Sequence, residues 1–449
     1  MKKNVILLLI LALAVRAFAQ DISFSGSLTA QTGIGLPNTH DNKGKFLFGQ
    51  SIFDGTVKAY FDNSKVYVNG QVWFDALGGQ ATNGFSSFTA DSGYFAFLLK
   101  EAYMDWKGDL FALRIGRQIA VWGKADDIQI ADILCPKDEA NRLARSYKDT
   151  PLGIDAVRLS IVTDNAQADA YWIPFFTPNT LPLAKGNPFH QFTFPGSMEG
   201  VPVLSPSNYT DLDSPEKKLA NSEYALRGSL YTSHVDLSIY GFYGWDDMPF
   251  MKYVPVMNAS GDINAINVLG EYKRMAMVGA DAAVPLGDFV LRFECAYFPN
   301  RHIQTSAEYQ KNRLSNGLGI KSTKQCHQII GLAGFDWSLR DGFMITVQYV
   351  GDVICNYNNA LERNQYDNQA TLSLEKPLLN ETVVLSASGA VDLRDLSTTS
   401  EIEIQWKFSD SITLGILGDL FLEGPDGKKG LFGEHHDLSC VTLKGKISF

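Results

Sequence analysis

The residues best placed to act on a solute are charged side chains between positions 114 and 132. Arg114 and Arg117 come first, and the carboxylates of Asp126, Asp127 and Asp132 follow. Basic groups facing acidic groups across a narrow aqueous passage would set up an electric field that favours polar solutes. The simpler alternative is a salt-bridged or solvated loop. The choice depends on whether these residues line a passage at all.

Groups that could support catalysis or bind a metal are weaker candidates. The run GEHHD at 433–437 could hold a metal ion, but adjacent histidines in a polar loop are usually only solvated. A hydrolase acting on lipid would need a Ser and a His in reach of each other, and no outward-facing strand His stands near a Ser. His302 and Glu308 are a weak basis for a protease. We therefore expect no enzyme, no metal site and no cofactor.

The first residues have the pattern of an export signal. Lys2 and Lys3 precede an unbroken apolar run at 5–15, and the sequence AFA at 17–19 supplies the small residues that signal peptidase reads. We expect a signal peptide at 1–19 and one mature domain at 20–449. Losing Lys2, Lys3 and Arg16 takes the formal net charge from −10 to −13. This acidity disfavours nucleic acid as a partner, because phosphate binding needs a basic face.

Alternation of apolar and polar residues dominates the rest of the chain. Ile402, Ile404 and Trp406, for example, alternate with Glu401 and Glu403, a strand pattern with one apolar and one polar face. No later apolar stretch is long enough for a transmembrane helix. About eighteen such segments are centred near residues 26, 56, 70, 101, 113, 157, 169, 228, 239, 278, 293, 332, 347, 372, 387, 404, 417 and 443.

The connections between these segments alternate in length. Tight turns occur at 62–64, 107–109, 163–165, 286–288, 340–342 and 409–411. Long polar loops occur at 32–49, 77–93, 117–152, 176–222, 246–272, 299–325 and 352–367. Outer-membrane barrels have this asymmetry, with short periplasmic turns, long outer loops and an even strand number. The fold class predicted is therefore all-β, a transmembrane antiparallel up-and-down β-barrel of about 18 strands, and sixteen would also fit.

The alternation also predicts which side chains face lipid and which face the lumen. Trp106, Trp337 and Trp406 fall on the outward side near short turns, as in an aromatic girdle. In the turn at 340–342, a three-residue loop pairs Leu339 with Phe343 and needs a left-handed residue at Gly342. The lumen-facing charges expected are Glu101, Asp105, Arg114, Arg158, Arg227, Arg292, Glu294, Asp392, Glu401 and Lys407.

Five cysteines are scattered without metal-type spacing, at 135, 295, 326, 355 and 440. Cys326 and Cys355 come close at the outer end of one hairpin. The register pairs position 326 with 356, which puts the two thiols on opposite faces. A disulfide between them would need a bulge.

The chain ends in a further alternating segment. Val441, Leu443, Ile447 and the terminal Phe449 share one face. This segment resembles the C-terminal strand by which the barrel-assembly machinery recognises bacterial outer-membrane proteins. The resemblance implies that machinery as a partner during biogenesis, and the bacterial outer membrane, with its lipid, as the location.

Two loops are candidates for narrowing the bore. The loop at 117–152 has the ordinal position at which general porins, which it resembles here, fold a loop inward, and Pro136 followed by acids and then bases predicts a short helix within it. The loop at 176–222 is rich in proline and aromatic residues. It either covers the outer mouth or forms an exposed surface loop.

The string GRQ-x-x-x-WG at 116–123, followed by spaced aspartates, is similar to a motif of a poorly characterised domain-of-unknown-function family of porin-like outer-membrane proteins. The likeness covers roughly residues 112–140. It implies a barrel, and it implies nothing about the substrate.

The leading hypothesis is a water-filled channel for small polar solutes, because sixteen or eighteen strands leave an aqueous bore. One alternative is a gated transporter for hydrophobic compounds such as fatty acids. Alternation that begins at Ile22 leaves no room for the N-terminal plug of such transporters. Another is a surface adhesin or structural barrel. We expect a monomer or a homotrimer.

Overall fold

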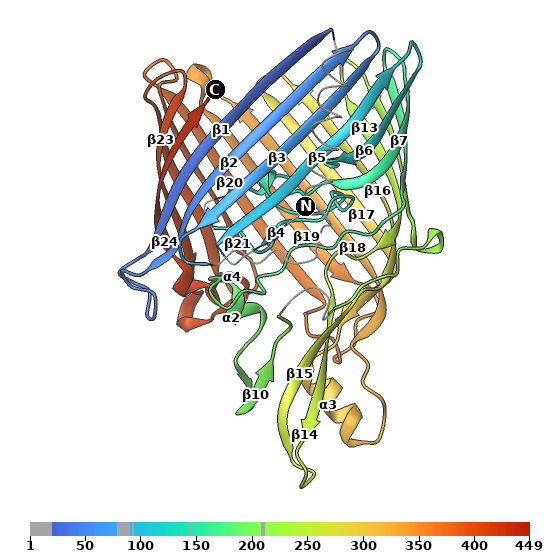
Figure 1. Ribbon diagram of the computed structural model, residues 1–449, viewed down its shortest axis with the longest axis vertical. Helices are drawn as coiled ribbons and strands as arrows, with labels where there is room; N and C mark the ends of the chain where they lie inside the picture. Colours follow the sequence, from blue (N-terminus) through green and yellow to red (C-terminus); the bar gives the residue numbers. More distant parts are fainter. Residues whose placement is uncertain (1–19, 79–89, 92–93, 144, 208–211) are drawn as a thin grey trace, which may run out of the picture.

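The computed structural model describes residues 20–78, 90–91, 94–143, 145–207 and 212–449. The predicted signal peptide at 1–19 lies outside these residues. The main sheet consists of the two-residue strand β4 (Ala90–Asp91) and 18 long strands that close into a barrel (Figure 1). The prediction of an all-β antiparallel barrel of 18 strands is confirmed. No helix in the described part of the chain is long and apolar enough to cross a membrane.

The 18 long strands follow the chain in an up-and-down order, and each contains one of the predicted segment centres. They are β1 (Asp21–Gly35), β2 (Phe46–Phe61), β3 (Ser64–Asp75), β5 (Phe95–Lys107), β6 (Phe111–Gln118), β7 (Ile154–Val162), β8 (Ala166–Ile173), β12 (Glu223–Tyr231), β13 (Asp236–Trp245), β16 (Arg274–Leu286), β17 (Phe289–Gln304), β18 (Thr323–Ser338), β19 (Met344–Ile354), β20 (Tyr366–Leu378), β21 (Val383–Asp392), β22 (Thr398–Lys407), β23 (Ile412–Leu422) and β24 (Cys440–Ser448).

The first and last strands close the barrel. β1 pairs with β24 from Ser27↔Ser448 to Gly35↔Cys440, and Gly26 and Phe449 exchange backbone hydrogen bonds of 2.8 and 3.0 Å. Phe449 is 69% exposed on the outer face and stacks on Phe53 of β2. Closure removes both sheet edges, so that the strands satisfy one another's backbone groups within a bilayer. Recognition of this strand by the assembly machinery stays a prediction.

Short turns and long connections lie at opposite ends of the barrel, which we call the short-turn end and the long-loop end (Figure 1). At the turn between β18 and β19, the Leu339 N–H donates to the Phe343 carbonyl at 2.8 Å, and Gly342 has φ +71°. The predicted register of this hairpin is confirmed. Outer-membrane barrels place their short turns in the periplasm.

Large apolar side chains cover the outer face of the barrel. Leu226, Ile239 and Trp406 are exposed there, whereas polar lumen-facing residues such as Asp169 and Gln348 are buried. Trp106 is likewise exposed on the outer face, and Cys295 is also exposed. Cys326 is buried and Cys355 exposed, and both are free thiols. These observations confirm the predicted alternation of lipid-facing and lumen-facing side chains.

The connection at 246–272, predicted to be a loop, contains a hairpin instead. β14 (Phe250–Met257) pairs with β15 (Ile263–Glu271), and the short strands β9 (Ser197–Met198), β10 (Val201–Leu204) and β11 (Leu212–Asp213) complete a second sheet at the long-loop end (Figure 1). Side chains protect the free edge of β14, because the Met251 N–H donates to Gln304 Oε1 at 2.8 Å and the Tyr253 N–H to Gln310 Oε1 at 3.1 Å. Capped edges of this kind resist pairing with another chain.

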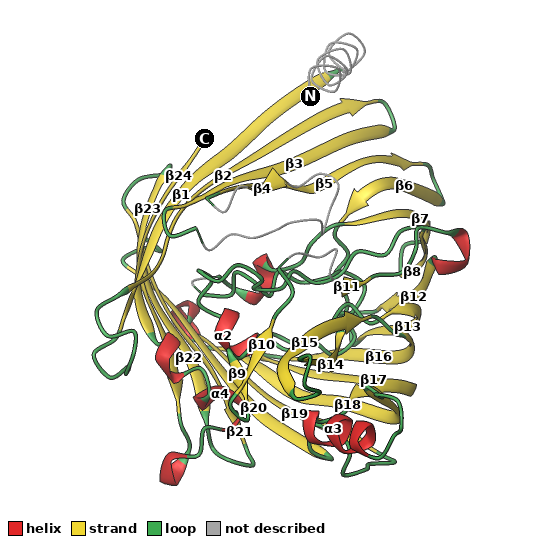
Figure 2. Cartoon of the chain, turned by 60° about the horizontal axis from the view of Figure 1, so that its bottom comes forward, coloured by secondary structure: helices red, strands yellow, loops and turns green. Residues whose placement is uncertain are grey.

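Helices are short and lie in the long connections. They are α2 (His190–Thr193), α3 (Ala307–Ser315) and α4 (Gly430–Gly433), with 3₁₀ turns at Tyr147–Asp149, Leu219–Asn221, Arg340–Gly342, Pro425–Gly427 and His436–Leu438. Two other connections contribute irregular chain to the inside of the barrel (Figure 2). We call residues 119–153, between β6 and β7, the inner segment, and residues 174–196, after β8, the mouth segment.

Candidate functional site

The inner segment crosses the bore from β6 to the far wall. Trp122 stacks on Tyr240 of β13 with ring centroids 5.0 Å apart, and its edge meets Tyr171 of β8. Ala131 and Ile130 are fully buried in the same apolar cluster, which extends along the wall as far as Val350 of β19. Burial of this cluster holds the segment against one side of the lumen.

One carboxylate of the wall fixes the middle of the inner segment. Glu294 of β17 accepts hydrogen bonds from the backbone N–H groups of Lys124 at 2.6 Å, Ala125 at 2.9 Å and Ala131 at 2.8 Å. Gly123 has φ +84°, and a Cβ atom there would come within 2.5 Å of Glu294 Oε1. Only glycine therefore combines this backbone conformation with so close an approach.

Ion pairs fix the rest of the inner segment. Asp126 accepts a 2.6 Å hydrogen bond from Arg292 of β17, which also pairs with Asp336 of β18. Asp132 accepts a hydrogen bond from the ammonium group of Lys137, which is only 2% exposed. Buried charges of this kind are stable only when they are paired, because burial of an unpaired charge has a large desolvation free energy that no partner offsets.

The helix predicted after Pro136 is wrong. Residues 136–143 are irregular, and the backbone of Lys137 and Asp138 forms isolated bridges with Pro151 and Thr180. The Asp138 carboxylate accepts hydrogen bonds from Thr180 and Arg145, both at 2.5 Å. Contacts with the mouth segment and with a distant part of the inner segment thus replace the local i→i−4 bonds of a helix. Tertiary contacts of this kind commonly override a weak local propensity.

The mouth segment crosses the barrel at the long-loop end. It starts beside β8, yet Phe189 is buried in a cluster with Phe48 of β2, Leu417 of β23 and Cys440 of β24 on the other side. The ring of His435, in the last long loop, meets Phe189, Phe192 and Phe421 edge to face. We call this cluster the mouth cluster; it also contains Leu47, Leu143 and Leu438.

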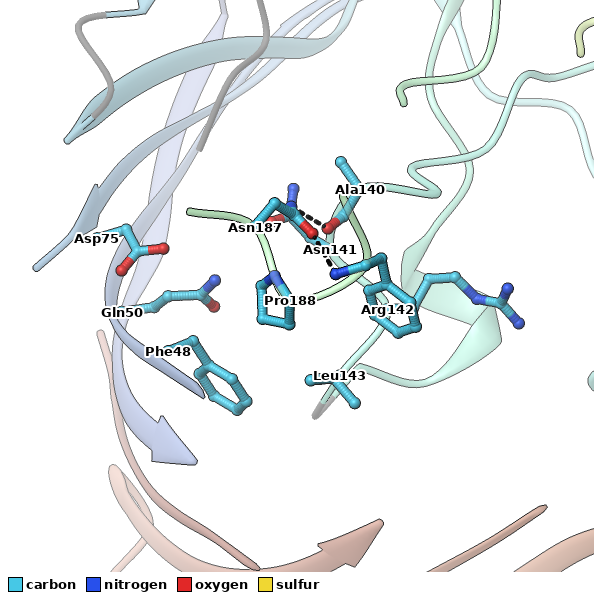
Figure 3. A pocket seen from close by; sticks show the side chains of 10 residues that line it. Phe48, Gln50, Asp75, Ala140, Asn141, Arg142, Leu143, Asn187 and Pro188 are labelled. Carbon is cyan, nitrogen blue, oxygen red and sulfur yellow. Dashed lines mark hydrogen bonds between the residues drawn. The ribbon is translucent and has the colours of Figure 1, made fainter. Parts of the chain in front are cut away.

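The two segments and the wall meet closely beside Phe48 (Figure 3). Asn187 of the mouth segment donates a 2.7 Å hydrogen bond to the carbonyl of Ala140 in the inner segment. On the wall side lie Phe48, Gln50 and Asp75, and the cavity left between wall and segments is about 20 Å³. This volume is enough for a single water molecule.

Burial governs the electrostatics of the mouth cluster. Burial of the ring, with a smaller contribution from the charge of Arg142, lowers the pKa of His435 to about 4. The buried Nδ1 atom of His435 has no hydrogen-bond partner among the described residues. His435 is therefore neutral at pH 7 and acts as an apolar ring in the cluster.

The predicted constriction residues divide into two groups. Asp126, Asp127 and Asp132 line one cavity of about 550 Å³, together with Arg292 and Glu294 of the wall. Arg114 and Arg117 lie elsewhere: Arg114 pairs with Asp105 at 2.9 Å and stacks on Tyr103, and the buried Arg117 pairs with Asp155 at 3.2 Å. Neither arginine is among the residues that line this cavity.

The other predicted lumen charges lie on strand positions that face inward. Arg158 pairs with Asp169 at 2.9 Å, Arg227 donates to Ser229 at 3.0 Å, and Glu101 accepts a hydrogen bond from the Ile119 N–H at 3.0 Å. Glu401 and Lys407 share a face of β22. Sequence reasoning missed Glu294 as an anchor and missed the partners Lys137, Asp155 and Asp169. Pairing of this kind depends on which strands become neighbours, and local spacing does not reveal it.

The last long loop carries two adjacent histidines, His435 and His436. His436 hydrogen-bonds the carbonyls of Phe421 and Asn38, both at 3.0 Å. Within the described residues, no group of three or more His, Cys, Asp or Glu side chains is arranged to hold a metal ion.

A closed antiparallel barrel with irregular segments inside is a fold found in outer-membrane channel proteins of bacteria. The structure of this chain is similar to that of OccAB3 of Acinetobacter baumannii, with 10% sequence identity over 96% of this chain and 99% of that chain and a TM-score of 0.51. It is also similar to OccAB1 of the same organism, with 9% identity over 96% of this chain and 97% of that chain and a TM-score of 0.52. It is also similar to OccK2 (OpdF) of Pseudomonas aeruginosa in complex with glucuronate (9%, 96% and 98%, TM-score 0.50). At these identities the likeness shows the fold alone.

The chain belongs to the family described as "Protein of unknown function (DUF1302)", whose model matches residues 19–412. This finding confirms the resemblance to a porin-like family that the GRQ-x-x-x-WG motif indicated. A search of curated proteins found no match.

Proposed function

We propose that the protein is an outer-membrane channel that admits small polar solutes. The observation that carries the proposal is the closed barrel of 18 strands, whose lumen face between β20 and β3 carries polar side chains such as Glu401, Lys444 and Gln50 beside a few apolar ones. Barrels of this size enclose a bore that side chains alone do not fill. A lumen face rich in Ser, Thr, Gln and carboxylates needs water, because burying such groups without partners is costly.

The inner segment narrows this bore in the proposed mechanism. It is anchored to the wall by Glu294 and by the cluster around Trp122, so it stays in place while solutes pass. The sequence-based constriction of Arg114, Arg117, Asp126, Asp127 and Asp132 stays a prediction. Among these five residues, we expect the three aspartates that line the 550 Å³ cavity to act on solutes more strongly than the two arginines. Both arginines form ion pairs with residues of the wall.

The mouth segment acts as a lid in the same proposal. The mouth segment runs from β8 to the mouth cluster beside β2, β23 and β24, where it would separate the lumen from the cell exterior. Irregular backbone at the height of a membrane is stable when protein covers it or when it lines a water-filled cavity. Opening of the lid would then control how often the channel conducts.

Swelling of liposomes that contain the purified protein tests the proposed function. We expect swelling in small sugars and amino acids, with a rate that falls as the solute becomes larger. Liposomes with an inactive outer-membrane barrel, prepared in the same way, are the control. Equal swelling rates in both preparations would contradict the proposal.

A gated transporter for hydrophobic compounds is the second candidate, favoured by the apolar character of the mouth cluster. Such a transporter would bind an apolar fluorescent probe at the long-loop end, and binding would fall when Phe189 is replaced by Ser. Sugar-driven swelling without probe binding would exclude it. We further propose that the protein is exported by its signal peptide and forms a monomer or a homotrimer, which sedimentation in detergent distinguishes.

A further inference from the structure

The cavity of about 550 Å³ lies between the inner segment and the wall formed by β16, β17 and β18. Its wall residues include Ala283, Val290 and Asp336, which come from the halves of these strands nearest the short turns. Cavities that hold small-molecule ligands measure about 300–1,000 Å³. This cavity is therefore large enough for a small solute, unlike the 20 Å³ space beside Phe48.

Some of the charges that line this cavity are already paired. Arg292 forms ion pairs with Asp126 at 2.6 Å and with Asp336. Its guanidinium group also donates a 3.1 Å hydrogen bond to the backbone carbonyl of Lys124. One cation of the wall thus serves two carboxylates and fixes the backbone of the inner segment.

Two charges of opposite sign in the same lining are left unpaired. Neither the ammonium group of Lys124 nor the carboxylate of Asp127 forms an ion pair with any described residue. They also do not pair with each other, although they are three residues apart on the inner segment. Charged groups that have no partner in the protein need water or a ligand to stabilise them. A solute that carries both charges could satisfy both residues.

Two uncharged polar groups of the lining also lack partners. The indole Nε1 atom of Trp122 and the hydroxyl oxygen of Tyr147 are buried, and neither forms a hydrogen bond within the described part of the chain. Trp122 as a whole is only 3% exposed. Buried polar atoms are nearly always hydrogen-bonded, and a missing partner often marks the place of a water molecule or ion. Both groups can donate a hydrogen bond, so their missing partner is an acceptor such as a carboxylate.

The rest of the lining is apolar and held in place. Val121 is 59% exposed and lines the cavity together with Ile128 and Val290. The backbone beside them is fixed, because the N–H of Lys124 donates to Glu294 at 2.6 Å. A site whose backbone is already ordered loses little conformational entropy when a ligand binds.

We propose that this cavity binds small zwitterionic solutes of the α-amino acid class. The solute ammonium group lies beside Asp127, its carboxylate beside Lys124, and its apolar side chain beside Val121. The inference rests on the proposed channel function and names the class of solute that the channel takes up. Opposite charges attract more strongly in a partly dehydrated cavity than in water, so a solute with both charges binds more tightly than one with either alone.

Calorimetric titration of the folded protein in detergent at neutral pH tests this proposal with three probes. L-leucine carries both charges, isocaproate lacks the ammonium group, and isoamylamine lacks the carboxylate. We expect L-leucine to bind about tenfold more tightly than either of the other two.

Two variants assign each charge to its residue. Asp127→Asn should weaken the binding of L-leucine about tenfold and leave that of isocaproate unchanged, whereas Lys124→Gln should weaken L-leucine and leave isoamylamine unchanged. Asp426→Asn is the matched control. It makes the same exchange at φ +63°, compared with +60° at Asp127, in the connection between β23 and β24. Asn tolerates this left-handed conformation, so both Asn variants should fold.

The outcomes separate the proposed site from the proposed function. Equal affinity for the three probes, or an equal loss in Asp426→Asn, overturns the zwitterion site. Liposomes that swell in sugars while the protein fails to bind L-leucine overturn the site and leave the channel function standing. A protein that binds L-leucine as expected but gives no swelling with any solute overturns the channel function and leaves the site standing.

Discussion

Glu294, on the wall, accepts a 2.6 Å hydrogen bond from the backbone N–H of Lys124, in the segment that crosses the lumen. Two further N–H groups of the same segment donate to this carboxylate. One side chain of β17 thus satisfies backbone groups that would otherwise be left unpaired inside the barrel. A carboxylate with several backbone donors is a strong anchor, because charge-assisted hydrogen bonds are about twice as strong as neutral ones.

Replacing Glu294 by Gln should loosen the inner segment. The amide keeps an acceptor oxygen, but its NH₂ group faces N–H donors, so we expect the inner segment's attachment to weaken by about 1–3 kcal/mol. The expected result is larger or noisier single-channel current and faster trypsin cleavage after Lys124. Glu375→Gln, on the lumen face of β20, is the control and should resemble the wild type. Unchanged cleavage at Lys124 would show that Glu294 is not the anchor.

Gly123→Ala should disturb the same anchor by steric means. The new Cβ atom would lie within 2.5 Å of Glu294 Oε1, and the backbone has φ +84°. Gly261→Ala is a matched control, since Gly261 has φ +88° and no atom within 4 Å of an added Cβ. Both variants carry a left-handed alanine at a cost of about 1 kcal/mol, but only Gly123→Ala should change conductance. Equal effects of the two would mean that the close approach is unimportant.

Lys137→Met should destabilise the inner segment because it leaves Asp132 buried without its cation. Losing one partner of a buried ion pair typically costs about 3–5 kcal/mol. Thermal unfolding followed by circular dichroism should therefore show a lower midpoint, and Asp132→Asn added to Lys137→Met should recover part of the loss. If the double variant is no more stable than Lys137→Met, the pair is not coupled in the way that the structure indicates.

Much of this architecture could be predicted from the sequence. Each barrel strand has a lipid face and a lumen face, and these appear in the sequence as alternating apolar and polar residues. Ile402, Ile404 and Trp406 reveal the lipid face of β22 without knowledge of its neighbours, and Gly342 reveals a turn. The interior could not be predicted in the same way. The contacts of Asp138 with Thr180, and of Glu294 with Lys124, join residues that lie far apart in the chain. The predicted helix after Pro136 failed for this reason.

Phe189→Ser should weaken the lid. The ring is buried in the mouth cluster, and removing a buried aromatic side chain typically costs about 3–5 kcal/mol. We expect the channel to be open for a larger fraction of the time. Phe175→Ser changes an exposed ring of the same mouth segment and serves as the control. A lid role is excluded if both variants gate like the wild type.

Mild acid should open the lid through His435. The pKa of this ring is about 4 in the closed structure and about 6.5 when it is exposed to water, so protonation favours the open state. The closed state keeps its full stability above pH 6.5 and loses it progressively as the pH falls toward 4, by up to about 3 kcal/mol. The positive charge of Arg142 adds to this effect.

Channel open probability measured between pH 7.5 and 4.5 checks this prediction. We expect it to rise as the pH falls in the wild type and to stay constant in His435→Leu. His234→Leu removes an exposed histidine from a short turn and should keep the wild-type response. A pH response that survives in His435→Leu would assign the effect to other groups.

Single-channel recording in planar bilayers tests the central claim, a water-filled passage through this barrel, most directly. The protein should first be shown to be folded by its resistance to unfolding in unheated detergent. We predict discrete and stable current steps for the wild type, with more frequent opening for Phe189→Ser. Bilayers that stay silent with both folded proteins would contradict the account.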